Sequence, residues 1–114
     1  MKYLFISFLA LSIVSCEKDK VPAIVDSNCP TTVSFNNEVL PIFQTNCVSC
    51  HSTGNTSPTL EDYTTISTNA DAALASLHGT PSLMPRDQNG TPFSLPDSVI
   101  QKVQCWINQG KKNN

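Results

Sequence analysis

The sequence has few aromatic residues, few charges and no long apolar segment. Of its 114 residues only 7% are aromatic and 14% charged, and the formal net charge is −2. The longest apolar run, Tyr3–Val14, is shorter than the roughly 20 residues that a membrane-spanning helix needs. No cluster of lysine and arginine is present, which argues against nucleic-acid binding and against a strongly acidic partner. The chain also lacks the alternating strand and helix patterns of an α/β fold. We therefore expect a small protein that neither spans a membrane nor binds nucleic acid.

The N-terminus has the pattern of an export signal. Lys2 precedes the apolar run, which predicts a signal peptide over residues 1–15. The stretch Leu11–Cys16 resembles a bacterial lipobox, in which the cysteine is lipidated and becomes the mature N-terminus; an ordinary cleavage site with an incidental cysteine is the alternative. Several acyl chains on Cys16 would hold the protein stably on a membrane. The charged segment Cys16-Glu17-Lys18-Asp19-Lys20 also resembles the start of lipoproteins of the Bacteroidetes type. We therefore expect an exported, membrane-tethered protein in the periplasm or on the cell surface.

After the signal, the chain divides into two parts. Residues 16–31 contain prolines and polar residues and predict a lipidated N-terminus with a flexible tether. Residues 32–114 predict a single folded domain with a modest core. Since few large aromatics remain to fill that core, a large apolar cofactor would complete it.

The segment Cys47-Val48-Ser49-Cys50-His51 is the most informative motif of the chain. A C-x-x-C-H sequence predicts covalent haem attachment, with the two cysteines bonded to the porphyrin and the histidine as a ligand of its iron. The alternatives are a thioredoxin-like or disulfide-forming Cys-x-x-Cys and one half of a zinc site. The export signal favours haem, and the motif predicts a metal-binding protein with one haem c per chain.

The five cysteines can be divided among three roles. Cys16 is assigned to lipid and the C-x-x-C-H pair to haem, which leaves Cys29 and Cys105. In an oxidising compartment such a pair most simply forms a disulfide, and two free buried thiols are the alternative. The bridge would place the segment before the first helix beside the last helix.

Apolar periodicity predicts an all-α chain with three to four short helices. The first runs into the C-x-x-C-H motif; Pro41 means either that Asn37 caps a late start or that Ser34 caps an early helix that bends at the proline. Two short helices are expected around 60–66 and 69–77, and a last one over 97–109. Residues 79–96 are rich in proline and predict a loop.

The proline-rich loop contains the candidate for a second iron ligand. An electron-carrying haem usually has Met or His opposite its first histidine. The mature chain offers Met84 in this loop and His78 at the end of the preceding helix. We favour Met84, because an irregular backbone can lay a flexible thioether over a porphyrin; His78 and an open site remain alternatives.

The segment Phe35–Ser52 resembles the start of small monohaem cytochrome c domains of the class I type, especially those of bacterial lipoproteins. Leu60–Tyr63, Leu83–Pro85 and Val103–Gly110 follow in that family's order. The resemblance implies an all-α cytochrome c fold in which the first and last helices cross. It also implies that Cys47 and Cys50 anchor the haem, that His51 and Met84 ligate the iron, and that Trp106 packs near the haem.

This reading predicts an electron-transfer protein and not an enzyme. With both axial positions filled by side chains, the iron can only exchange one electron with redox partners, a donor and an acceptor. We expect a monomer tethered by its lipid. A haem-based peroxidase or gas sensor and a structural haem module of a surface lipoprotein are the alternatives.

Overall fold

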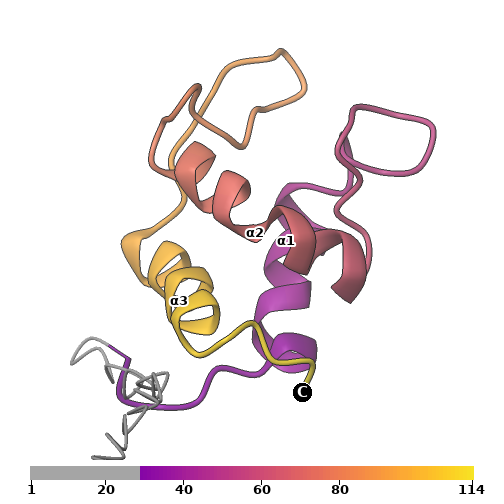
Figure 1. The fold of residues 1–114 in the computed structure, drawn as a ribbon. Coiled ribbons are helices and arrows are strands. Elements are labelled where there is room, and N and C mark those ends of the chain that lie inside the picture. Colours follow the sequence, from indigo (N-terminus) through magenta and orange to yellow (C-terminus); the bar gives the residue numbers. More distant parts are fainter. Residues whose placement is uncertain (1–28) are drawn as a thin grey trace, which may run out of the picture.

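The computed structural model describes residues 29–114, and this part of the chain is helical (Figure 1). The π-helix η1 (Phe35–Val39) leads into α1 (Leu40–Asn46), followed by α2 (Tyr63–Leu77) and α3 (Asp97–Asn108). Within residues 29–114 there is no strand; Arg86 and Pro92 form only an isolated bridge. The expected all-α class is therefore confirmed. The predicted signal peptide and Cys16 lie outside the described residues.

The first helix follows the alternative in which Ser34 caps an early start. The Ser34 hydroxyl accepts the Asn37 N–H at 3.2 Å. Pro41 has no N–H to donate and its ring crowds the carbonyl of Asn37, four residues earlier. The turn before the proline is widened into the π-helix η1, a known response to such an obstruction. The chain thus continues through Pro41 as one helical rod made of η1 and α1.

Helix α2 corrects the sequence prediction of two short helices. It is one helix of 15 residues, and its start is fixed by a capping box between Asp62 and Thr65. Polar residues in the middle do not break it, because Thr68 and Asn69 donate to carbonyls four residues earlier, at 2.7 and 2.8 Å. The helix ends before Gly79, whose φ of 92° is the left-handed conformation that ends many helices.

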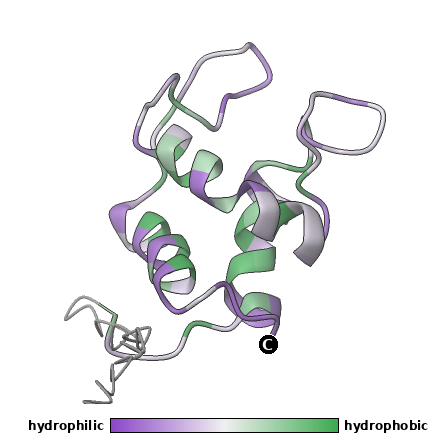
Figure 2. Cartoon of the chain, viewed as in Figure 1, coloured by the Kyte–Doolittle hydropathy of each residue, from purple (hydrophilic) through white to green (hydrophobic). Residues whose placement is uncertain are grey.

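Helix α3 matches its prediction within one residue at its end and crosses η1 and α2. The buried side chains of α3 lie on one stripe. Figure 2 shows apolar residues on α1 and on one side of α3. The two long loops, residues 52–59 and 79–95, are mostly neutral or hydrophilic. The fully buried centre of the core lies at this crossing. Its largest members are Trp106, Phe35, Phe43, Ile66, Val39 and Val103.

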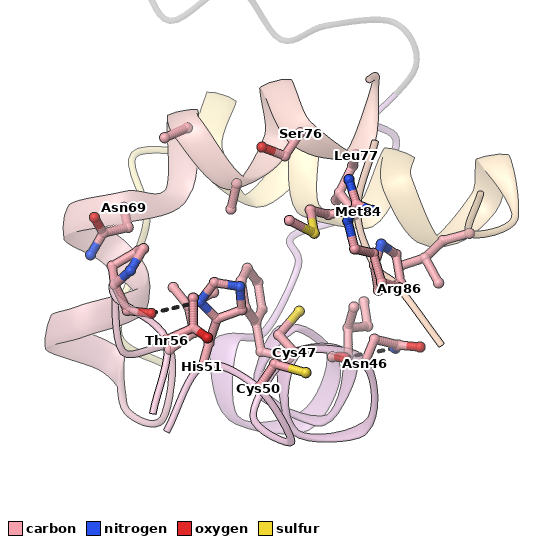
Figure 3. A pocket seen from close by; sticks show the side chains of 18 of the residues that line it. Asn46, Cys47, Cys50, His51, Thr56, Asn69, Ser76, Leu77, Met84 and Arg86 are labelled. Atoms are coloured by element: carbon pink, nitrogen blue, oxygen red, sulfur yellow. Dashed lines mark hydrogen bonds between the residues drawn. The ribbon is translucent and has the colours of Figure 1, made fainter. Parts of the chain in front are cut away.

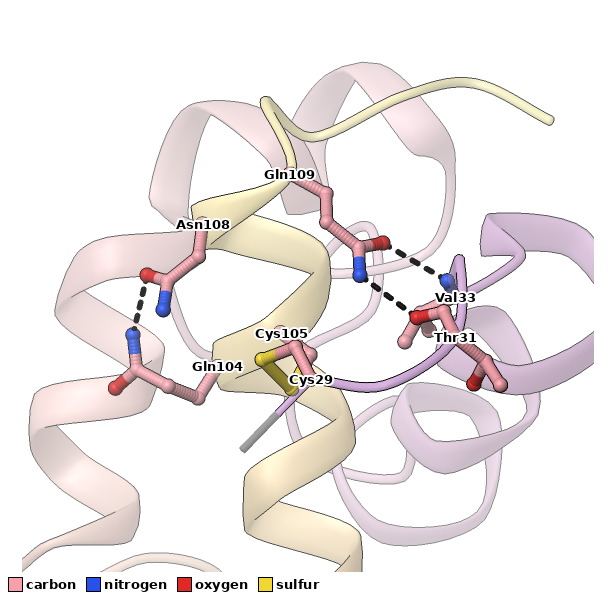
Figure 4. Close-up of a disulfide and its surroundings, with 7 residues drawn as sticks. All are labelled: Cys29, Thr31, Val33, Gln104, Cys105, Asn108 and Gln109. Carbon is pink, nitrogen blue, oxygen red and sulfur yellow. Dashed lines mark hydrogen bonds between the residues drawn. A yellow bond between two sulfur atoms is a disulfide. The ribbon is translucent and has the colours of Figure 1, made fainter. Parts of the chain in front are cut away.

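A disulfide between Cys29 and Cys105 ties the first described residue to α3 (Figure 4). The two Cα atoms are 5.5 Å apart and the sequence separation is 76 residues. Beside the bridge, the Gln109 side chain accepts the Val33 N–H and donates to the Thr31 carbonyl, both at 2.8 Å. The pair is the one expected from the cysteine count, and such a bridge indicates an oxidising, exported compartment. Among the described residues, no helix has the length and apolarity to cross a membrane.

Candidate functional site

A cavity of about 460 Å³ lies between α1, α2 and the loops over residues 52–59 and 79–95 (Figure 3). In Figure 1 these two loops stand at the end of the molecule opposite the start of the described chain. Its volume falls within the range of small-molecule and cofactor pockets. Apolar and small side chains make most of its wall. The residues that line it are Ile42, Phe43, Asn46, Cys47, Cys50, His51, Thr56, Ser57, Pro58, Leu60, Asn69, Ala72, Ala73, Ser76, Leu77, Met84, Pro85, Arg86 and Leu95.

The C-x-x-C-H motif forms a helical turn that extends the end of α1. The Cys47 N–H donates to the Phe43 carbonyl at 2.8 Å, and the His51 N–H donates to the Cys47 carbonyl at 2.8 Å. In a helical turn, residues three and four apart lie on the same side. Both sulfur atoms and the imidazole therefore border the same cavity, as Figure 3 shows.

The His51 ring is oriented by a backbone carbonyl from the following loop. Its Nδ1 lies 2.8 Å from the oxygen of Pro58, so Nδ1 carries the proton and donates (Figure 3). The other ring nitrogen, Nε2, is then the one with a lone pair. A ligating histidine is commonly oriented in this way, because the outer hydrogen bond fixes both the tautomer and the ring plane.

The two thiols of the motif are free, in contrast to the bridged pair at the opposite end. Burial, with a smaller contribution from the neighbouring Cys50, raises the pKa of Cys47 to about 11. At neutral pH Cys47 is therefore a protonated thiol. Since metal ions bind the thiolate, this environment disfavours a thiolate ligand.

The prediction of a metal-binding protein is wrong in the sense of a metal ion held by the chain's own side chains. Among residues 29–114, no group of three or more His, Cys, Asp or Glu side chains could hold an ion. The physical reason is that no carboxylate lines the cavity, and that burial raises the pKa of Cys47 to about 11, which keeps this thiol of the motif protonated. Within the described residues, no further side chains complete the motif to a zinc site. The helical fold likewise gives no support to a thioredoxin-like Cys-x-x-Cys.

Met84 reaches the same cavity from the proline-rich loop, whereas His78 does not. The Met84 N–H donates to the Ser76 carbonyl near the end of α2 at 3.0 Å, and its thioether points into the cavity across from His51 (Figure 3). His78 is exposed at the end of α2 and is absent from the cavity wall. The structure therefore brings together Cys47, Cys50, His51 and Met84.

Trp106 does not join this set. Its side chain is fully buried at the helix crossing, with its ring 5.4 Å from that of Phe35, and its indole N–H donates to the Lys112 carbonyl at 2.9 Å. It does not line the cavity. Trp106 therefore stabilises the crossing of α3 with η1, outside the cavity wall.

Two residues of the site were missed by the sequence analysis. Pro58 orients His51, and Arg86 is the one cavity-lining side chain with a permanent charge. Each follows a predicted ligand within a few residues, Pro58 in the loop after His51 and Arg86 two residues after Met84. Their closeness in sequence to the predicted ligands His51 and Met84 was the one signal that could have pointed to them. It was not enough, because the composition of a loop does not give the path of its backbone.

Comparisons of this chain with protein-family models, with curated proteins and with solved structures found no match.

Proposed function

We propose that the chain is a c-type cytochrome that carries single electrons. Cys47 and Cys50 would hold one haem c through thioether bonds, and His51 and Met84 would ligate its iron from opposite faces. The observation that carries this proposal is the cavity itself: residues distant in sequence contribute two thiols, an imidazole and a thioether to one apolar pocket. The domain around it would be a cytochrome c fold.

The donor set fits a porphyrin better than it fits a bare ion. A porphyrin brings four nitrogen ligands of its own, so the chain needs to supply only two axial ligands, and the absence of a larger ligand cluster is no obstacle. The cysteines then serve as carbon-bonding anchors. When bound, the haem supplies an iron that changes between the ferrous and ferric states by one electron.

The residues of the chain would tune and protect that centre. The Pro58 carbonyl holds the His51 imidazole in place. The thioether of Met84 favours the reduced state, and the apolar wall disfavours the extra charge of the oxidised state. With both axial positions occupied, substrate has no access to the iron, so we propose electron exchange with a redox donor and acceptor and no enzymatic activity. A lipid on Cys16 would keep this carrier at a membrane.

The decisive experiment is a denaturing mass measurement on protein exported from a host that matures c-type cytochromes. We expect the wild-type mass to exceed that of the processed, disulfide-bonded chain by one haem plus the lipid. Cys47→Ser with Cys50→Ser should lose the haem and keep the lipid, whereas Cys16→Ser should lose the lipid and keep the haem. A colourless wild-type protein without added haem mass would refute the proposal.

The axial ligand is tested by optical spectroscopy. The oxidised protein should show a sulfur-to-iron band in the near infrared that Met84→Ala abolishes and His78→Ala leaves intact. A wild-type protein that is high-spin, with no such band, would instead support the sensor or peroxidase alternative. A haem that exchanges no electrons in voltammetry would support the structural alternative.

A further inference from the structure

The loop between His51 and α2 carries the carbonyl that orients the imidazole. Residues 53–58 of this loop are all exposed, so little apolar burial holds it in place. The Pro58 carbonyl nevertheless lies 2.8 Å from His51 Nδ1, which requires a defined backbone path (Figure 3). Hydrogen bonds, and not packing, must therefore fix the path of this loop.

A backbone bond and a side-chain contact close the loop at its two ends. The Leu60 N–H donates to the His51 carbonyl at 2.8 Å. The Glu61 carboxylate oxygen Oε2 accepts two bonds from Thr53, one from the backbone N–H at 2.9 Å and one from the hydroxyl at 2.6 Å. Bonds to a charged acceptor are shorter and stronger than bonds between neutral groups. Glu61 thus joins the end of the loop to its start.

The backbone of Glu61 is itself held by its two neighbours. Asp62 is the N-cap of α2 and takes part in the capping box that fixes the first turn of the helix. Leu60 is buried in the core. The carboxylate is therefore held at the start of a helix, and it holds in turn Thr53, two residues after His51.

We propose that Glu61 is a positioning residue that maintains the hydrogen bond between His51 and the Pro58 carbonyl and so sets the ligand strength of the imidazole. The inference rests on the proposed function. An imidazole whose outer N–H is bonded to a carbonyl is a more basic ligand, and its ring plane is fixed. A more basic ligand favours the ferric state, because that state carries one more positive charge. Loss of the Glu61 contact should therefore loosen the His51 bond and raise the reduction potential.

The test follows the Nδ1 proton of His51 by NMR in the reduced, haem-loaded protein. The rate at which this proton exchanges with solvent reports how often its bond to Pro58 opens. Glu61→Ala removes two hydrogen bonds and should raise this rate by about 5- to 30-fold, and the reduction potential should rise with it. Glu61→Gln, whose amide oxygen can still accept from Thr53, should keep most of both wild-type values. An unchanged exchange rate in Glu61→Ala would overturn the inference.

Thr53→Val is the milder variant and serves if Glu61→Ala fails to fold. It removes the hydroxyl bond alone and should raise the exchange rate by about 2- to 10-fold. In the Glu61→Ala background the same substitution should change the rate by less than about twofold, because both changes act on one contact. An unchanged rate in Thr53→Val, or additive effects of the two substitutions, would overturn the inference.

The matched control is Thr59→Val, which makes the same chemical change at the other end of the loop. Within residues 29–114 the Thr59 hydroxyl makes no hydrogen bond, and this residue does not line the cavity. The exchange rate and the potential of Thr59→Val should stay close to those of the wild type. Equal effects of Thr53→Val and Thr59→Val would overturn the inference while leaving the proposed function intact.

Two further readouts separate the possible failures. The amides of Ile100–Trp106 should exchange as in the wild type in every variant, because the expected effect is confined to the loop. Faster exchange there too would show a general loss of stability and would overturn the inference. Failure of the wild type to acquire haem would refute the proposed function instead.

Discussion

The helix crossing and the cavity end of this molecule differ in what fills their interiors. At the crossing, the Phe35 ring packs edge-on against the Tyr63 ring and at a tilt against the Trp106 ring, with centroids 5.1 and 5.4 Å apart. The polar atoms of these rings are paired as well, since the Tyr63 hydroxyl donates to the Lys111 carbonyl at 2.8 Å. At the other end, two long loops enclose a hollow of about 460 Å³. The helix crossing is packed by the chain's own side chains, whereas the side chains at the other end leave a cavity between them.

The difference shows how a domain with few aromatic residues divides its apolar material. The rings of Phe35, Tyr63 and Trp106 lie where three helical segments meet. The cavity is lined by Phe43 and by small residues such as Ala72 and Ala73. Protein interiors are normally close-packed, and an apolar cavity of about 460 Å³ has the size of a small-molecule or cofactor pocket. The bridge to Cys29 strengthens the packed end and leaves the cavity end dependent on loop hydrogen bonds.

Amide hydrogen exchange on the haem-free Cys47→Ser, Cys50→Ser protein should show the largest contrast. The hydrogen bonds of loops 52–59 and 79–95 are turn and loop bonds outside the helices, so the amides of these loops should exchange through local opening, with a free energy well below that of global unfolding. Amides of Ile100–Trp106 should exchange only through global unfolding. Equal protection in both regions would contradict the comparison.

The next contrast is between two aromatic truncations. Trp106→Ala removes a fully buried side chain and should lower the free energy of unfolding by about 3–5 kcal/mol. Phe93→Ala, in the loop beside the cavity, removes a ring that is 43% exposed and should change it by no more than about 0.5 kcal/mol. Denaturant titration of both variants measures the difference, and similar losses would break the comparison.

Removing the disulfide tests the packed end alone. Cys29→Ser with Cys105→Ser opens a loop of 76 residues, which the chain-entropy treatment values at about 4 kcal/mol. Thermal and denaturant unfolding should both show the loss. The optical spectrum of the proposed haem should stay unchanged in the folded variant, because the bridge lies away from the cavity. An altered spectrum would show that the two ends are coupled.

The smallest effect concerns the ion pair that joins η1 to α3. The pKa of Glu38 lies below its ordinary value of 4.5. The main cause is the hydrogen bond from the Ser34 N–H to its carboxylate, and the second is the Lys102 ammonium, whose Nζ lies 3.1 Å from Glu38 Oε1. The Glu38 carboxylate therefore stabilises the folded state at pH values above 4.5. This contribution is lost as the pH falls through the lower pKa that Glu38 has in the folded state. At pH 7 and low salt, Glu38→Gln should cost less than about 1 kcal/mol, because both side chains are partly exposed.

The difference between wild type and Glu38→Gln in denaturant titrations should shrink when the pH is lowered well below 4.5. High salt at pH 7 should reduce it too, because ions screen exposed pairs. A difference that grows on acidification would show that the charge of Glu38 is not what stabilises the native state.

Features that depend on a few neighbouring residues could be predicted from the sequence. The C-x-x-C-H motif predicts two sulfurs and an imidazole at one cofactor, and the structure brings these three groups to one cavity. The apolar stripe of the last helix predicts α3 within one residue. The division of 60–77 into two helices was wrong, because the polar side chains of Thr68 and Asn69 bond back to the helix and do not interrupt it. The choice at Pro41 was left open and was decided by the cap at Ser34.

The all-α class, the bounds of α3, the C-x-x-C-H motif and the cysteines left for a disulfide could be predicted from the sequence, because helical period and motif spacing act over a few residues. Only the tertiary structure decided that Met84 and not His78 reaches the cavity, that Trp106 lies behind it, and that Pro58 and Arg86 border it. Those outcomes depend on the paths of two loops and on how α3 crosses η1. Such long-range packing is set by the sum of many weak contacts, which no short stretch of sequence contains.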